Sequence, residues 1–311
     1  MKYEGGLNSD LQYSVERSAL KNAQEAFTLG KFTSKKSVPQ KNGHALKVHY
    51  WEHIATSEIQ DLVEGVTPQS TDMVRVSRTG QLKRQGAWVP FTDELMEQHE
   101  NAAEFHKETS KELGYTLGGK LEADAFSVSL NDAGVVVDVA VAGSIDQALK
   151  DARKAFRINN APKFTTIKTG STKVGTKPVN AGWYLFCSIN DADVYREAGD
   201  FLSVEDYGYT SDLAENEIGV IKSLGIRIVE NPRVGDGMSL MLGDEGLATL
   251  DLSAKNRIEY IVKELGTSVT VADDGTVAPD ALDQAGSIGV KSRTGSMVLM
   301  PRYVCRLENV S

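Results

Sequence analysis

The feature of the sequence that most constrains the fold is the segment of residues 60–93, which predicts the tip and returning strand of a long β-hairpin. The outgoing strand is predicted at residues 44–54, where the side chains alternate: Leu46, Val48 and Tyr50 point to one side, and Lys47, His49, Trp51 and His53 to the other. A two-stranded ribbon alone is marginally stable in water. We therefore expect this hairpin to lie on another structure, and the rest of the chain favours a second copy of the same protein.

The composition is that of a globular protein with room for one large core or two smaller ones. The chain has 311 residues, of which 41% are hydrophobic and 25% charged. A net charge of −9 disfavours a dedicated DNA-binding domain. Cys187 and Cys305 lie in apolar runs, so we expect buried, reduced thiols. The sequence predicts neither a membrane span of about 18 apolar residues nor a signal peptide.

Charge is divided between two segments near the N-terminus. Residues 1–42 contain few large apolar side chains, and four lysines (Lys31, Lys35, Lys36 and Lys41) arrive with no acidic residue between Glu25 and Glu52. This pattern predicts an extended basic arm. The hairpin tip, residues 55–72, carries Glu58, Asp61 and Glu64 and has no lysine. Opposite charges on two extended segments can steer the pairing of neighbouring copies.

A long helix is predicted from Thr92 to about Ser129, with an interruption near Asn101. Its N-terminus has capping residues followed by acidic ones, and its apolar ridge comprises Leu113, Leu117 and Leu121, joined by Phe105 and Phe126. Three glycines (Gly114, Gly118 and Gly119) each cost roughly 1 kcal/mol relative to alanine in a helix interior. They indicate either the close approach of another backbone or a bend.

The remaining elements read as a mixture of strands and helices. We expect a strand over 134–142, a helix capped by Ser144, a buried strand over 182–189, a short helix over 191–198, a strand, turn and strand over 218–234, and a strand or short helix over 256–265. The last two strands, 286–292 and 297–307, alternate well enough that we expect them to pair with each other.

Two short motifs resemble catalytic or binding sequences. His49, Glu52 and His53 match H-x-x-E-H, a zinc hydrolase pattern that needs all three side chains on one face of a helix. In a strand, the two histidines would face one side and the glutamate the other. Residues 170–177 resemble a phosphate-binding loop with its last two residues exchanged, but Pro178 follows where a helix should begin. We therefore expect a basic surface loop over 162–178, no enzymatic activity, no metal and no cofactor.

Several stretches, in this order and spacing, carry a resemblance to a known family. They are Leu62–Pro68, Gly182–Tyr195, Ile218–Val234, Leu282–Lys291 and Arg302–Glu308. Together they resemble the major capsid proteins of tailed bacteriophages, and most closely the branch named after coliphage N-four.

The resemblance implies an α+β protein with the Hong Kong 97-like capsid fold. Its parts would be an N-terminal arm (1–42), an extended hairpin loop (43–92), a peripheral domain with a long spine helix (93–162), an axial domain (163–255) and a return to the peripheral domain (256–311). The hairpin would lie across one neighbouring subunit, and the arm would reach another. We expect contacts between copies at Lys35, Lys36, Trp51, Glu58, Asp61, Glu64 and Trp88.

The function that the resemblance implies is self-assembly into hexamers and pentamers that form an icosahedral head around double-stranded phage DNA. The implied partners are a separate scaffolding protein, a portal protein and a cement protein, because the tip has no lysine for the covalent linkage that some members form. DNA would be contacted non-specifically on the inner face, and assembly would take place in the bacterial host cytoplasm. The alternatives are the shell protein of a cellular nanocompartment and, in another class, a metal-dependent hydrolase using His49, Glu52 and His53.

Overall fold

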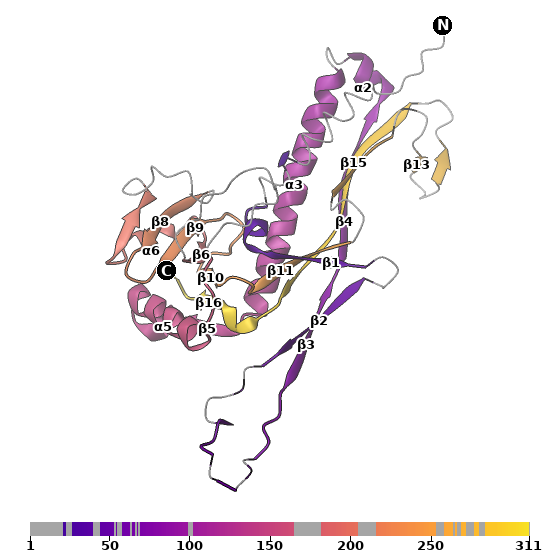
Figure 1. The fold of residues 1–311 in the computed structure, drawn as a ribbon. Helices are drawn as coiled ribbons and strands as arrows, with labels where there is room; N and C mark the ends of the chain where they lie inside the picture. The colour runs from indigo at the N-terminus through magenta and orange to yellow at the C-terminus, as the bar shows by residue number, and fades with distance from the viewer. Residues whose placement is uncertain are drawn as a thin grey trace, which may run out of the picture.

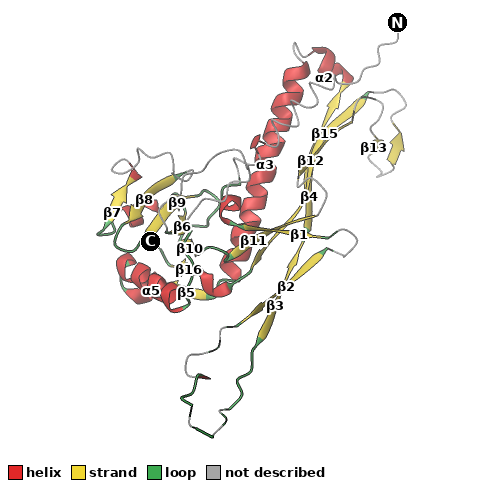
Figure 2. Ribbon diagram, in the orientation of Figure 1, coloured by secondary structure: helices red, strands yellow, loops and turns green. Residues whose placement is uncertain are grey.

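The computed structural model is a mixed α+β protein with two main sheets, a long helix and a projecting ribbon (Figures 1 and 2). The structure describes residues 21, 22, 27–39, 44–52, 54, 58–62, 64, 65, 67, 69–98, 102–164, 182–204, 216–252, 258–263, 265, 269–271, 277–279 and 284–310.

One sheet is built around the longest strand, β15. Along one edge β15 pairs antiparallel with β4, and along the other with β12 and β11. Strand β1 extends the sheet by pairing parallel to β11. The five strands are β1 (Ser34–Val38), β4 (Lys83–Thr92), β11 (Leu247–Leu252), β12 (Ile258–Lys263) and β15 (Ala285–Val298).

Two consecutive helices follow β4, and the longer one lies along a face of the five-stranded sheet (Figure 1). Helix α2 spans Asp93–Gln98, where Thr92 Oγ1 accepts a hydrogen bond from the Leu95 amide (3.3 Å), and α3 spans Ala102–Asn131. The predicted ridge is confirmed: Leu113, Leu117, Leu121 and Phe126 are buried together with Ile288 and Val290 of β15.

A second sheet has seven strands in the order β5, β16, β10, β6, β9, β8 and β7. Strand β6 pairs parallel with β9 and antiparallel with β10. The strands are β5 (Val135–Asp138), β6 (Trp183–Cys187), β7 (Phe201–Ser203), β8 (Glu217–Ile221), β9 (Ile226–Glu230), β10 (Met238–Leu242) and β16 (Val304–Glu308).

Both faces of the seven-stranded sheet are covered, which explains why β6 is a continuous apolar run. On one side Trp183, Leu185 and Cys187 pack with buried residues of α5 (Ile145–Ile158) and α6 (Ala192–Arg196). On the other side Tyr184 and Phe186 belong to the core that contains α3. Cys187 and Cys305 are buried free thiols, as predicted, and burial raises the pKa of each to about 12.

The predicted hairpin is present and projects away from the body of the molecule (Figure 1). Strands β2 (Ala45–Trp51) and β3 (Arg75–Gln81) pair antiparallel, and the side chains of β2 alternate between exposed and half-buried as expected. Only the root of the hairpin has a core: Leu46 and Val48 pack against a buried cluster of Val38, Ala248, Leu250 and Met297. No described residue from 50 to 74 belongs to a hydrophobic core.

The described part of the N-terminal segment differs from a free arm. Phe27, Leu29 and Phe32 are buried in the core beneath α3, and a short 3-10 helix, η1, spans Leu29–Phe32. Strand β1 then joins the sheet of the same chain. The sequence obscured this because three widely spaced apolar side chains are enough to anchor a short segment in a core that other elements build.

The predicted pairing between the last two strands is wrong. Residues 293–296, which were expected to separate two strands, continue β15 because β11 pairs with Thr294–Val298. Pro301–Tyr303 then forms a 3-10 turn, and β16 enters the other sheet between β5 and β10.

Three smaller predictions are resolved by the structure. Residues 258–263 form a strand rather than a helix, and the strand predicted over 134–142 ends at Asp138, where α4 (Val139–Ala142) begins. The helix capped by Ser144 is confirmed, since its hydroxyl accepts a hydrogen bond from the Gln147 amide (3.2 Å). Strands β13 (Val269–Val271) and β14 (Val277–Pro279) pair beyond β12.

Candidate intersubunit surfaces

The tip of the hairpin exposes apolar and acidic side chains together. Ile59 and Leu62 are 77% and 78% exposed, among the highest values for large hydrophobic side chains in the described part of the chain. The predicted contact residues Glu58, Asp61 and Glu64 are also exposed and lie between or beside them. An extended segment that exposes large apolar groups at this level is typical of a surface that is covered in an assembly.

The ribbon below the tip continues this exposed surface. Trp51 is 53% exposed, and the guanidinium of its cross-strand partner Arg75 lies 6.0 Å from the centre of the indole ring. Met73 and Val74 are each more than half exposed, and the Val74 carbonyl accepts a hydrogen bond from the Glu52 amide (2.9 Å). The ribbon therefore keeps its pairing to Glu52 while presenting apolar side chains to solvent.

The apolar residues of the hairpin were missed by the sequence interpretation, which selected only the acidic residues of the tip. The signal was available, because large apolar side chains recur in a segment predicted to have little core of its own. Such side chains have no place to be buried within the chain. The residues concerned are Ile54, Ile59, Leu62, Met73 and Val74.

The predicted contact residues Lys35 and Lys36 lie on β1, at the edge of the five-stranded sheet. Both side chains are exposed, and their backbones pair with Thr249 and Leu250 of β11. Their positions are therefore fixed by the sheet, and their ammonium groups are presented to solvent.

Trp88 lies on the face of the five-stranded sheet that α3 does not cover. Its neighbours in the sheet show this: Ile288 and Val290 point into the core with α3, and Trp88 stands opposite Gly289 between them. Gly289 in turn pairs with Ile261 of β12, so Trp88 (67% exposed) and Ile261 flank a residue without a side chain. The result is a row of two apolar groups with a low centre on an open sheet face.

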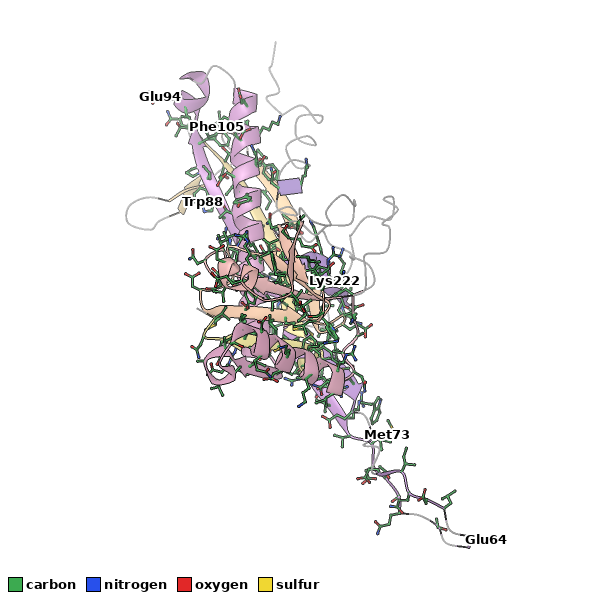
Figure 3. The ribbon with its side chains drawn as sticks, turned by 90° about the vertical axis from the view of Figure 1, so that its left-hand side faces the viewer. Glu64, Met73, Trp88, Glu94, Phe105 and Lys222 are labelled. Carbon is green, nitrogen blue, oxygen red and sulfur yellow. The ribbon has the colours of Figure 1, made fainter. Side chains whose placement is uncertain are left out.

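The structure does not bring the predicted contact residues together within one chain. Figure 3 shows Glu64 at the far end of the hairpin and Trp88 near the other end of the molecule, with Met73 between them. Lys35 and Lys36 lie in the sheet at the root of the hairpin. A contact between the tip and these surfaces therefore requires a second copy of the chain.

The geometry gives little support to a metal-dependent hydrolase. His49 is on the exposed face of β2 and Glu52 follows the strand, whereas His53 lies outside the described residues. Partial desolvation and then the charges of Arg75 and Lys47 lower the pKa of His49. In the described part of the chain, no group of three or more His, Cys, Asp or Glu side chains is arranged to hold a metal ion.

Two other sequence predictions are covered only in part. The basic loop and its phosphate-loop-like motif, residues 170–177, lie outside the described residues. Within the described helices, none combines the length and the apolar character needed to cross a membrane.

The fold and these surfaces define the class of the protein. Two sheets that share α3, with a ribbon whose apolar tip is left uncovered by the chain itself, describe a subunit that associates with copies of itself. Comparison with solved structures gives the same class. The chain is similar to the capsid of the cyanophage P-SCSP1u (14% identity, 88% of this chain and 86% of that one, TM-score 0.55). It is also similar to the head of the Helicobacter pylori bacteriophage KHP40 (12%, 93% and 91%, TM-score 0.55).

A third similar structure is a virus-like particle from Pyrococcus furiosus (11% identity, 95% of this chain and 98% of that one, TM-score 0.54). At these identities the likeness shows the fold, which is the Hong Kong 97-like capsid fold. None of the curated proteins matches the sequence significantly.

The sequence matches the phage capsid protein family over residues 75–307, and the chain therefore belongs to that family. It is a major capsid protein, a structural component of the phage head shell that associates with copies of itself.

Proposed function

We propose that this major capsid protein assembles as hexamers and pentamers into an icosahedral head that encloses double-stranded DNA, and that it is closest to the N-four-like branch. The observation that carries the proposal is the projecting ribbon with Ile59 and Leu62 exposed at its tip. Such a ribbon has no stabilising contacts beyond its root in the single chain, so neighbouring subunits supply them.

The tip, in this proposal, docks on a neighbouring copy through apolar and charged groups. Glu58, Asp61 and Glu64 approach exposed lysines such as Lys35 and Lys36, while the apolar residues cover an exposed surface such as the row of Trp88 and Ile261. Trp51 forms part of the same contact along the ribbon.

The domain division proposed from the sequence is an arm (1–42), a hairpin loop (43–92), a peripheral domain (93–162), an axial domain (163–255) and a return (256–311). Sheet membership supports assigning α3 and β15 to the peripheral part and β6, β8 and β9 to the axial part. It also favours moving β5, α5 and β16 to the axial part, since they pair or pack with that sheet.

The wider assembly includes partners that act in the host cytoplasm before DNA packaging. A separate scaffolding protein, a portal protein and a cement protein remain part of the proposal, with non-specific contacts to DNA on the inner face and no membrane partner. A net charge of −9 is consistent with weak binding to packaged DNA.

Electron microscopy of the purified full-length protein tests the proposal. We expect closed shells containing both hexamers and pentamers, and nuclease-protected DNA in particles from infected cells. Closed shells that enclose protein rather than DNA would instead support the nanocompartment reading. A monodisperse monomer that never forms shells would contradict both.

The charge pairing has its own test. Lys35→Glu combined with Lys36→Glu should lower the yield of shells and change its dependence on salt, because each exposed ion pair contributes about 0–1 kcal/mol but is repeated in every subunit. Shell yield would be measured by sedimentation over a range of salt concentrations. An unchanged yield and salt dependence would rule out these lysines as partners of the tip.

A further inference from the structure

A single buried carboxylate joins three parts of the chain. Glu122, on α3, is 2% exposed, and its Oε1 accepts hydrogen bonds from the backbone amide of Leu29 (3.0 Å) and from Nδ2 of Asn231 (2.9 Å). Leu29 begins η1, and Asn231 directly follows β9 of the seven-stranded sheet. Glu122 therefore connects the long helix to the N-terminal segment and to the second sheet.

The groups around Glu122 are held in place by further bonds. The backbone amide of Thr28 also donates to the carboxylate. The Asn231 amide donates to the Cys187 carbonyl, and its Oδ1 accepts from the Arg233 amide, each at 2.9 Å. The donors are therefore positioned by η1 and by the turn after β9, independently of Glu122.

Arg233 provides the positive charge that acts on Glu122, and Gly119 makes room for it. A Cβ at position 119, one turn before Glu122, would lie 2.6 Å from a guanidinium nitrogen of Arg233. This explains one of the glycines of the helix, although the close neighbour is a side chain and not the backbone that the sequence suggested.

The carboxylate is costly in this environment. Burying an ionised group costs free energy unless its partners compensate, and a glutamine of the same shape could accept the same two hydrogen bonds without that cost. Burial raises the pKa of Glu122, and the hydrogen bonds and the charge of Arg233 offset this only in part.

The direction of the resulting pH dependence follows from linkage. When residues 27–33 are displaced, Glu122 reaches water and its pKa returns to its ordinary value. The packed state then has the higher pKa and binds the proton more tightly. Acidification therefore favours the packed segment, and this contribution is lost as the pH rises through the pKa of the packed state.

We propose that Glu122 makes the N-terminal segment releasable: residues 27–33 are held firmly when the carboxyl group is neutral and loosely when it is charged. This goes beyond the shell function. Release would expose Phe27, Leu29 and Phe32, three apolar side chains that are buried in the described structure and that a neighbouring subunit could then bind. Arg233 is the charged group that faces the carboxylate from the turn after β9, and the 28–29 segment presents only backbone amides to it.

Hydrogen exchange of the full-length protein tests this proposal. After correction for intrinsic exchange, residues 27–33 should exchange more slowly at about pH 5.5 than at neutral pH, by up to tenfold for each unit by which burial raises the pKa. Glu122→Gln should give slow exchange at both pH values. Glu112→Gln, an exposed change on the same helix, should leave the wild-type behaviour intact.

A second variant keeps the test decisive if Glu122→Gln folds poorly. Arg233→Met removes the compensating charge, so exchange of residues 27–33 should become faster at neutral pH and approach the wild-type rate under acidic conditions. Exchange that is independent of pH in the wild type, or a neutral-pH rate unchanged by both variants, would overturn the proposal.

Discussion

At the residue scale, the most strongly determined group is a buried polar trio in the seven-stranded sheet. Arg227 Nε donates to Glu217 Oε1 (2.6 Å), and Arg227 NH1 donates to the hydroxyl of Tyr184 (3.2 Å). The side chain of Glu217 is fully buried and that of Arg227 is 10% exposed. Burial raises the pKa of Tyr184 to about 12, although the charge of Arg227 opposes this. The trio joins β6, β8 and β9 on the face that meets α3.

Arg227→Met should destabilise the subunit by about 3–5 kcal/mol, because Glu217 would be left charged and buried without its partner. The midpoint of denaturant-induced unfolding measures this. Arg196→Met is the matched control: Arg196 pairs with Asp193 and Glu230 at the surface, so the cost should be about 0–1 kcal/mol. Equal effects of the two changes would show that the trio does not stabilise the sheet.

At the scale of elements, the root of the hairpin is set by close backbone packing between β3 and β15. A Cβ on Gly295 would overlap the carbonyl oxygen of Gln81, and one on Gly86 would lie 2.6 Å from the carbonyl oxygen of Val290. Gln85 of β4 also donates a hydrogen bond to Asp124 of α3, which Lys120 contacts at 3.1 Å. The ribbon therefore leaves the body at an angle that these contacts fix.

Gly295→Ala should destabilise the subunit by about 1–3 kcal/mol, because a methyl group cannot be placed without moving β3 away from β15. The hairpin should then become more accessible to limited proteolysis, which provides a second measurement beside the unfolding midpoint. Gly235→Ala is the control, since a Cβ there meets nothing within 4 Å. If the two variants behave alike, the close approach at Gly295 does not position the hairpin.

At the scale of the whole molecule, the single chain is only partly self-sufficient. Three clusters of buried residues hold the two sheets, α3 and the hairpin root together, whereas the described residues of the tip are exposed. Stability of the subunit and assembly of the shell therefore depend on different residues, and substitutions can separate the two properties.

Ile59→Ser combined with Leu62→Ser should leave the unfolding midpoint of the subunit unchanged, because both side chains are more than three-quarters exposed. Shell formation should fall sharply, since the apolar area that would be buried at about 25 cal/mol per Å² is lost in every copy. Sedimentation and electron microscopy measure assembly. Val141→Ser, which changes an 84% exposed residue away from the hairpin, should have little effect. Normal shells from the double variant would contradict docking of the tip.

The sequence by itself determined the elements whose signals are local. Alternation revealed β2, the i, i+4 ridge revealed α3, the capping serine revealed α5, and a continuous apolar run revealed β6. In each case the period of burial matches the period of the element, so the pattern is visible without knowledge of the partner. The exposed acidic tip was visible for the same reason.

Only the tertiary structure decided which elements share a sheet. The assignment of β15 and β16 to different sheets, the anchoring of Leu29 and Phe32 under α3, and the meeting of Glu122 with Asn231 all join residues that are distant in sequence. A side chain's own pattern records that it is buried or polar, but not which partner it meets. That partner is chosen by the packing of the whole chain, because many distant pairings satisfy the same local pattern.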